Sequence, residues 1–148
     1  MSALSDEAEA MYNSGFSCAQ SVLACAGRQW GLSREMAVRL GEAFGAGMCR
    51  HDQTCGAVTG GLMAIGLKYS RGEWRDDAMR QKANETASEF MARFAALNGS
   101  VTCTGVLGVN LADPAGEEEA QRKGLFATVC ARAVRDAVEI LEDLLGAG

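Results

Sequence analysis

The stretch HDQTCGAVTGGLMAIG, from His51 to Gly66, constrains the fold of this chain more than any other. Its apolar residues recur at steps of three and four, which predicts a helix beginning near Cys55. Gly56 and Gly60 lie about one turn apart on one face of that helix. A glycine inside a helix costs about 1 kcal/mol relative to alanine. We therefore expect another group to approach this face closely, either a neighbouring helix or a bound cofactor beside Cys55.

The composition favours an all-α protein. The 148 residues include one proline, and alternating runs of β-branched residues are nearly absent. A chain of this length suits one domain and can bury a core without disulfides or metals. We expect a compact single domain over residues 1–148, a bundle of about five main helices around the central glycine-rich one.

Capping signals and apolar periodicity predict the other helices. Ser17 and Gln20 have the spacing of a capping box, and Thr102 can cap a short helix. The most regular apolar stripe belongs to a long helix that ends at Asn98-Gly99. The expected helices cover residues 6–13, 17–30, 34–44, 55–70, 74 or 75 to 97, a short segment after 102, and 125–145, with an exposed acidic loop at 113–119.

The charge and hydropathy of the chain indicate which classes of partner and which environment to expect. A net charge of -5 and a pI near 4.9 argue against a nucleic-acid partner, since no basic patch is visible. The N-terminus MSALSDEAEA lacks the plan of a signal peptide, so we expect a cytoplasmic protein. The longest apolar stretch, residues 54–67, falls short of the roughly 20 residues that span a bilayer. Membrane insertion is therefore not expected.

Three of the six cysteines directly follow a residue that can cap a helix. Backbone N–H groups and the helix dipole at an N-terminus favour a thiolate, which is the form that reacts and binds metal. The three pairs are Ser17-Cys18, Thr54-Cys55 and Thr102-Cys103. Cys130 is expected inside the last helix, facing the core, and Cys25 as a small core residue. Four thiolates that converge would suit zinc or an iron–sulfur cluster.

The absence of any C-x-x-C argues against a thioredoxin-type motif, a zinc ribbon and a haem-attachment site. A hydrolase or transferase also lacks support. His51 is the single histidine, and no second base is visibly paired with a nucleophile.

Four separated motifs carry a resemblance to a known family. They are GFSCAQSVL (15–23), GAGMCRHDQTCGAVTGGLMAIGLKYSRG (45–72), CTGVLGVNL (103–111) and FATVCARAV (126–134). In this order, and over nearly the whole chain, they resemble the C-GCAxxG-C-C family of redox-active proteins. The resemblance matches the family's cysteines to Cys18, Cys55, Cys103 and Cys130, with Cys55–Gly60 as the CGAxxG signature.

This family is similar to the N-terminal domain of split-Soret cytochromes, which implies an α-helical domain with an iron–sulfur cluster. Haem is not expected, because the chain has no C-x-x-C-H. Cys49 stands where the family usually has a glycine, and Cys25 is likewise an addition. Cys49 is therefore a candidate additional ligand or resolving thiol.

The resulting hypothesis is an iron–sulfur redox protein that serves electron transfer or redox sensing, as a carrier rather than a catalyst. We expect the four family cysteines as ligands, Gly56 and Gly60 beside the cluster, [2Fe-2S] rather than [4Fe-4S], and an electron-transfer partner; a homodimer is compatible with the chain. One alternative is a thiol-disulfide protein in which Cys55 attacks and Cys49 or Cys103 resolves. Another is a zinc-binding or structural interaction module.

Overall fold

The computed structural model describes residues 2–146, and within them it contains helices and no strand. The all-α prediction is confirmed. Five helices in this part of the chain have ten or more residues: α1, α2, α5, α6 and α9. The elements are α1 (Ala3–Asn13), α2 (Cys18–Gly27), η1 (Arg28–Trp30), α3 (Arg34–Gly41), η2 (Glu42–Phe44), α4 (Gly45–Met48), α5 (Gly56–Tyr69), α6 (Asp77–Asn98), α7 (Cys103–Leu107), α8 (Pro114–Arg122), η3 (Phe126–Cys130) and α9 (Ala131–Leu145).

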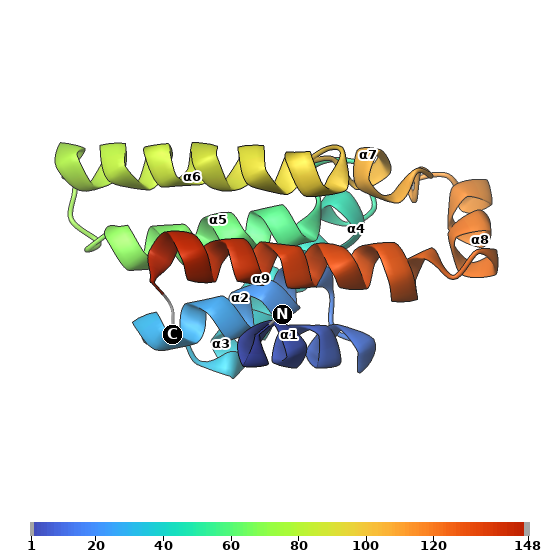
Figure 1. Cartoon of the computed structure of the whole chain (residues 1–148), viewed down its shortest axis with the longest axis horizontal. Helices are drawn as coiled ribbons and strands as arrows, with labels where there is room; N and C mark the ends of the chain where they lie inside the picture. Colours follow the sequence, from blue (N-terminus) through green and yellow to red (C-terminus); the bar gives the residue numbers. More distant parts are fainter. Residues whose placement is uncertain (1, 147–148) are drawn as a thin grey trace.

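The glycine-rich helix α5 is central, as expected. It packs against α2, α6 and α9, and α2 also contacts α1 and α3 (Figure 1). The long helix α6 runs along α5, while α7 and α8 lie together at one end of the molecule. The C-terminal helix α9 contacts α1, α2, α5 and α6. This arrangement gathers the beginnings of α2, α5 and α7 near the beginning of α9.

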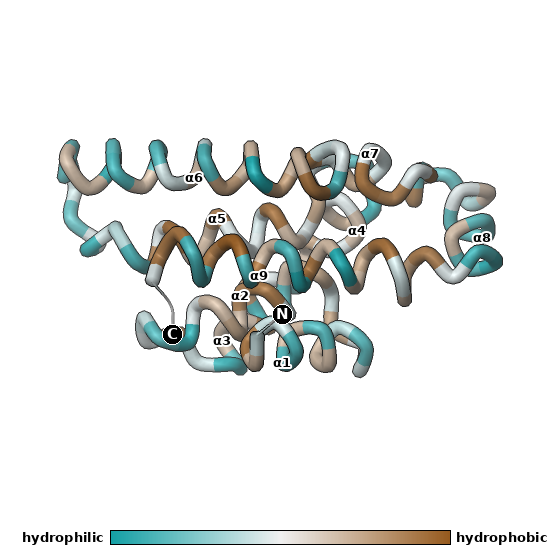
Figure 2. Tube along the Cα trace, viewed as in Figure 1, coloured by the Kyte–Doolittle hydropathy of each residue, from teal (hydrophilic) through white to brown (hydrophobic). Residues whose placement is uncertain are grey.

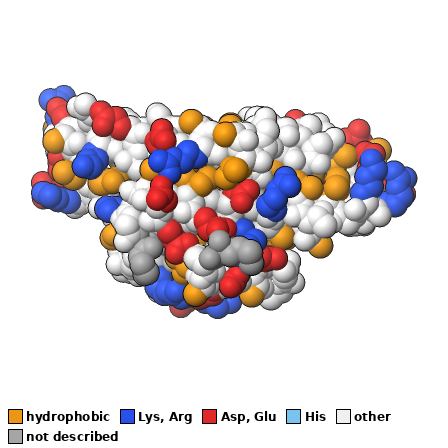
Figure 3. Space-filling view, in the orientation of Figure 1, with side chains coloured by type: hydrophobic (Ala, Val, Ile, Leu, Met, Phe, Trp, Pro, Cys, Tyr) orange, Lys and Arg blue, Asp and Glu red, His pale blue; other side chains and the backbone are white. Residues whose placement is uncertain are grey.

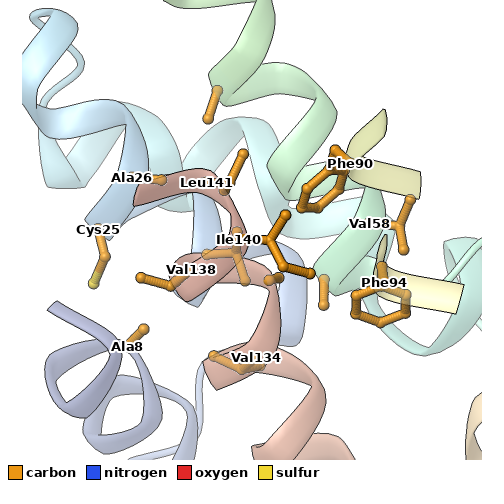
Figure 4. Packing of buried hydrophobic residues seen from close by; sticks show 14 of the residues in the cluster. Ala8, Cys25, Ala26, Val58, Phe90, Phe94, Val134, Val138, Ile140 and Leu141 are labelled. Atoms are coloured by element: carbon orange, nitrogen blue, oxygen red, sulfur yellow. The ribbon is translucent and has the colours of Figure 1, made fainter. Parts of the chain in front are cut away.

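The main core lies between α1, α2, α5, α6 and α9. Phe90 and Phe94 of α6 are fully buried and meet Val58 of α5 and Val134 of α9 in one cluster (Figure 4). Each such side chain contributes about 1.5–3 kcal/mol through burial. The opposite face of α6 is largely hydrophilic (Figure 2). The helix is thus held by one apolar stripe, which is the pattern that its periodicity predicts.

The expected loop at residues 113–119 is wrong, because α8 occupies it. Asp113 caps this helix by accepting a hydrogen bond from the Ala115 amide at 3.0 Å, and Pro114 occupies the first turn. An acidic cap followed by proline at the first helical position is a helix-start signal. The acidic run Glu117 to Glu119 therefore belongs to a helix rather than to an extended loop.

Helix boundaries elsewhere shift by a few residues. A capping box between Ser2 and Ser5 starts α1 at Ala3, three residues before the expected start. The long helix α6 begins at Asp77 behind the cap Asp76, because Asp76 accepts from the Met79 amide at 3.2 Å. In both cases the side chain of the cap residue accepts a hydrogen bond from the amide three residues later, and this bond determines where the helix begins.

Acidic and basic side chains are interspersed on the face seen in Figure 3. Arg135 of α9 pairs with Asp6 at 2.7 Å and with Glu9, which ties α1 to α9. Ion pairs at the surface typically contribute at most about 1 kcal/mol each. Within the described residues, every helix is too short or too polar to cross a membrane.

Candidate functional site

Four cysteines line one cavity of about 340 Å³. They come from four elements that are distant in sequence: Cys18 begins α2, Cys55 precedes α5, Cys103 begins α7 and Cys130 ends η3. Apolar side chains form much of the remaining wall. The other residues lining the cavity are Tyr12, Gly15, Phe16, Ser17, Ala46, Gly47, Arg50, Gly56, Val106, Leu107, Leu111, Phe126 and Ala133.

A capping box places Cys18. The Ser17 side chain accepts from the Gln20 amide at 3.2 Å, and the Gln20 side chain accepts from the Ser17 amide at 2.9 Å. This reciprocal pair, which the sequence predicted, determines where the first turn of α2 begins. Cys18 is the first residue of that turn, so its position depends on two local hydrogen bonds.

A short antiparallel bridge between Thr54 and Thr102 positions two further cysteines. The Cys55 amide donates to the Val101 carbonyl at 2.8 Å, and the Cys103 amide donates to the Gln53 carbonyl at 2.9 Å. Side chains alternate across such a bridge, so both cysteines lie on the face opposite the two threonines. Standard strand spacing puts their Cα atoms roughly 8 Å apart.

The prediction that Thr54 caps the central helix is wrong. Cys55 itself is the cap residue, and α5 begins at Gly56. Thr102 does cap α7, by accepting from the Gly105 amide at 3.0 Å. The backbone of residues 54 and 55 is extended by the bridge, and this delays the helix by one residue.

Cys130 lies in a π-helical segment that no sequence pattern predicted. Residues Phe126–Cys130 form this wider turn, and α9 follows directly. The extra residue in this turn changes the direction in which the neighbouring side chains point, compared with a regular α-helix. π-turns are common at functional sites. Cys130 is half-buried and lines the cavity, whereas Val134 one turn later is fully buried in the core.

The thiols of Cys18 and Cys130 lie close enough for each to shift the pKa of the other. Cys18 donates to the Cys130 sulfur, and this bond is the main reason that the pKa of Cys18 is raised and that of Cys130 lowered. The hydroxyl of Tyr12 also donates to Cys130 and lowers its pKa further. Tyr12 comes from α1, and nothing in its local sequence marked it as part of a site.

Burial outweighs the helix N-terminus at the other two thiols. It raises the pKa of Cys55 to about 11, although the amides of Ala57 and Val58 favour the thiolate. It also raises the pKa of Cys103 to about 12, and charge on Cys55 and Cys130 acts in the same direction. Helix position alone would have favoured thiolates, so that expectation is reversed for the metal-free protein.

The two stripe glycines differ in what they touch. Gly56 lines the cavity, and a Cβ there would lie 2.9 Å from the Ala19 amide nitrogen and 3.1 Å from the Cys18 Cβ. Gly60 is not a lining residue. A Cβ at Gly60 would lie 2.8 Å from the Ala19 carbonyl oxygen, so the close approach there is the crossing of α5 with α2.

The two additional cysteines lie outside the cavity. Cys25 is buried in the main core, as expected. Cys49 is exposed and is not a lining residue, although Gly47 and Arg50 on either side of it are. Among residues 2–146, no three His, Cys, Asp or Glu side chains lie close enough together to hold a single metal ion.

A family model described as "Putative redox-active protein (C_GCAxxG_C_C)" matches residues 16–144, which is nearly the whole chain. The match contains all six cysteines and begins after Tyr12. Comparison with curated proteins and with solved structures gives no match.

Proposed function

The chain belongs to the C_GCAxxG_C_C family of redox-active proteins, and we propose that it is a redox protein that holds an iron–sulfur cluster in the four-cysteine cavity. The observation that carries the proposal is the convergence of four thiols on one largely apolar cavity of about 340 Å³. Cys18, Cys55, Cys103 and Cys130 would be the ligands, since four thiolates are the usual donor set of such clusters.

The spacing of the donors supports a cluster over zinc. In a tetrahedral zinc site the ligand sulfurs lie about 3.8 Å apart, given Zn–S bonds of about 2.3 Å. No three donor side chains in residues 2–146 approach closely enough to hold one ion. A group with more than one metal atom suits ligands that are spread around a space. The preference for [2Fe-2S] over [4Fe-4S] stays a prediction.

The surrounding residues suit this role. A bound cluster would supply one-electron transfer. The apolar walls limit water, and Tyr12 donates a hydrogen bond to Cys130, which is one of the means by which proteins adjust cluster potentials. Burial raises the pKa of Cys55 to about 11, so loading the site must release protons. Loading is therefore expected to weaken as the pH falls.

Serine substitutions test the ligand assignment. Cys18→Ser, Cys55→Ser, Cys103→Ser and Cys130→Ser should each lose most bound iron after anaerobic purification. Cys25→Ser and Cys49→Ser are the matched controls and should retain it, because neither residue lines the cavity. Iron loss in Cys25→Ser together with retention in Cys130→Ser would refute the assignment.

A second candidate is a thiol-disulfide protein, which the proximity of Cys18 and Cys130, inferred from their mutual pKa shifts, favours. The lowered pKa of Cys130 makes it the better nucleophile of that pair. Cys55 with Cys103 is less suitable, because Cα atoms roughly 8 Å apart exceed disulfide geometry. Mild oxidation of metal-free protein followed by peptide mapping tests this candidate. A single reversible Cys18–Cys130 disulfide would support it, and mixed disulfides without a preferred pair would contradict it.

A further inference from the structure

A single charged side chain belongs to the wall of the four-cysteine cavity. Among the residues from 2 to 146 that line this cavity, Arg50 alone carries a permanent charge. Its guanidinium pairs with Glu117 of α8, which is not a lining residue, and 47% of the Arg50 side chain is exposed. The wall therefore holds one positive charge, and the carboxylate that balances this charge lies outside the wall.

A left-handed turn places Arg50 beside the cavity. Residues 46–50 all have positive φ angles, between 44° and 71°, and only Gly47 among them is a glycine. Other residues adopt this conformation at a cost, and conformations of this kind cluster at functional sites. The turn lies against one of the cavity cysteines, because a Cβ at Gly47 would lie 2.7 Å from the Cβ of Cys103. Arg50 follows Gly47 within the same turn.

The charge of Arg50 acts on that cysteine. Burial raises the pKa of Cys103, and Arg50 opposes the rise by favouring the thiolate. Asp52 acts in the same direction as burial. Its carboxylate is already engaged at the start of α7, where it accepts from the Thr104 amide at 3.1 Å and from the Thr104 hydroxyl. Arg50 therefore favours negative charge inside the cavity.

We propose that Arg50 raises the reduction potential of the group that the four thiolates hold, and that Glu117 weakens this effect. The inference rests on the proposed function. Four thiolates make the loaded site negative, and uptake of one electron from a one-electron donor, which is itself oxidised, makes the site more negative by one charge. A positive charge in the wall stabilises the reduced state more than the oxidised state. Arg50 is thus a positioning residue for charge and not a ligand.

Reduction potentials of the iron-loaded chain test the proposal, measured by titration at an electrode with dye mediators. Arg50→Gln should lower the equilibrium constant for reduction about tenfold, or about 59 mV for one electron, as expected for one charge at an effective dielectric constant of about 20. Arg50→Lys keeps the charge and should restore most of the native potential. Glu117→Gln should raise the potential above the native value. Arg122→Gln is the matched control, because Arg122 also pairs with a glutamate of α8 but does not line the cavity.

A second readout uses metal-free protein and does not depend on a cluster. Cys130 is alkylated with anionic iodoacetate or with neutral iodoacetamide, and peptide mapping gives the two rates. Their ratio reports the charge near the sulfur, because a change in the amount of thiolate affects both reagents alike. Arg50→Gln should lower the ratio of the iodoacetate rate to the iodoacetamide rate about threefold, since the site then attracts the anion less. Arg122→Gln should leave the ratio unchanged.

The outcomes separate this inference from the proposed function. Native protein that binds no iron would refute the proposed function and with it the redox role of Arg50, whatever the alkylation ratio. With iron bound, equal potentials in Arg50→Gln and the native chain would overturn the inference alone. An equal fall in Arg50→Lys and Arg50→Gln, or an alkylation ratio that Arg50→Gln does not change, would also overturn it, because the charge of Arg50 would then not act on the cavity.

Discussion

The glycine stripe of α5 leads to a sharp stability prediction at Gly60. An added Cβ would lie 2.8 Å from the Ala19 carbonyl oxygen and 3.2 Å from its Cα, both backbone atoms of α2. Backbone cannot swing aside as a side chain can, so overpacking should cost about 2–3 kcal/mol. Alanine regains about 1 kcal/mol of helix propensity. The net loss for Gly60→Ala is therefore about 1–2 kcal/mol.

At this chain length 1 kcal/mol corresponds to about 3 °C in melting temperature. Gly60→Ala should thus lower the melting temperature of metal-free protein by about 3–6 °C, measured by circular dichroism. Gly66→Ala is the matched control, because the same helix carries Gly66 and a Cβ there meets nothing within 4 Å. It should raise the melting temperature by about 3 °C.

Gly61→Ala extends the series. Its Cβ would lie 2.3 Å from the ring of Phe90, which is fully buried in the core. A buried ring has little room to move, so this variant should melt below Gly60→Ala. A Gly60→Ala protein that melts at or above the native temperature would refute the helix-crossing account. In that case the expectation from the sequence, that Gly60 borders a cofactor, would still stand.

Two further substitutions test separate parts of the structure. Tyr12→Phe removes a donor to Cys130, so the pKa of Cys130 should rise and its thiolate absorbance should appear at higher pH in metal-free protein. Tyr69→Phe is the control and should leave this titration unchanged, because Tyr69 does not line the cavity. An unchanged titration in Tyr12→Phe would show that its hydroxyl does not reach the sulfur. Asp113→Ala removes the α8 cap and should cost about 1 kcal/mol of stability, seen as a fall of about 3 °C in the melting temperature. Glu118→Ala on the same helix is the control and should leave the melting temperature nearly unchanged. Equal melting temperatures of the two variants would mean that the cap contributes nothing.

Local patterns with short-range causes could be predicted from the sequence. The Ser17–Gln20 capping box and the Thr102 cap place Cys18 and Cys103 where the structure has them. The start of α8 has an equally local signal, the pair Asp113-Pro114. The acidic run that follows this pair led to the prediction of an exposed loop instead of a helix.

Features that depend on distant residues could not be predicted in this way. The bridge that makes Cys55 the cap of α5 forms with residues almost fifty positions later. The π-turn before α9 has no periodicity of its own to detect. Gly60 and Gly56 look equivalent on a helical projection, and both approach Ala19 of α2; only the assembled fold shows that Gly56 lines the cavity and Gly60 does not. Burial, which reverses the expected thiol pKa shifts, is likewise a property of the assembled fold.

The central claim concerns what the four cysteines hold, and the metal content of anaerobically purified protein tests it most directly. The account predicts iron and acid-labile sulfide in equal amounts, with broad sulfur-to-iron absorption in the visible range; two irons per chain would agree with [2Fe-2S]. It also predicts that acid removes both together, because the ligand thiols take up protons again. Colourless protein that contains one zinc per chain, or no metal after reconstitution with iron and sulfide, would contradict it.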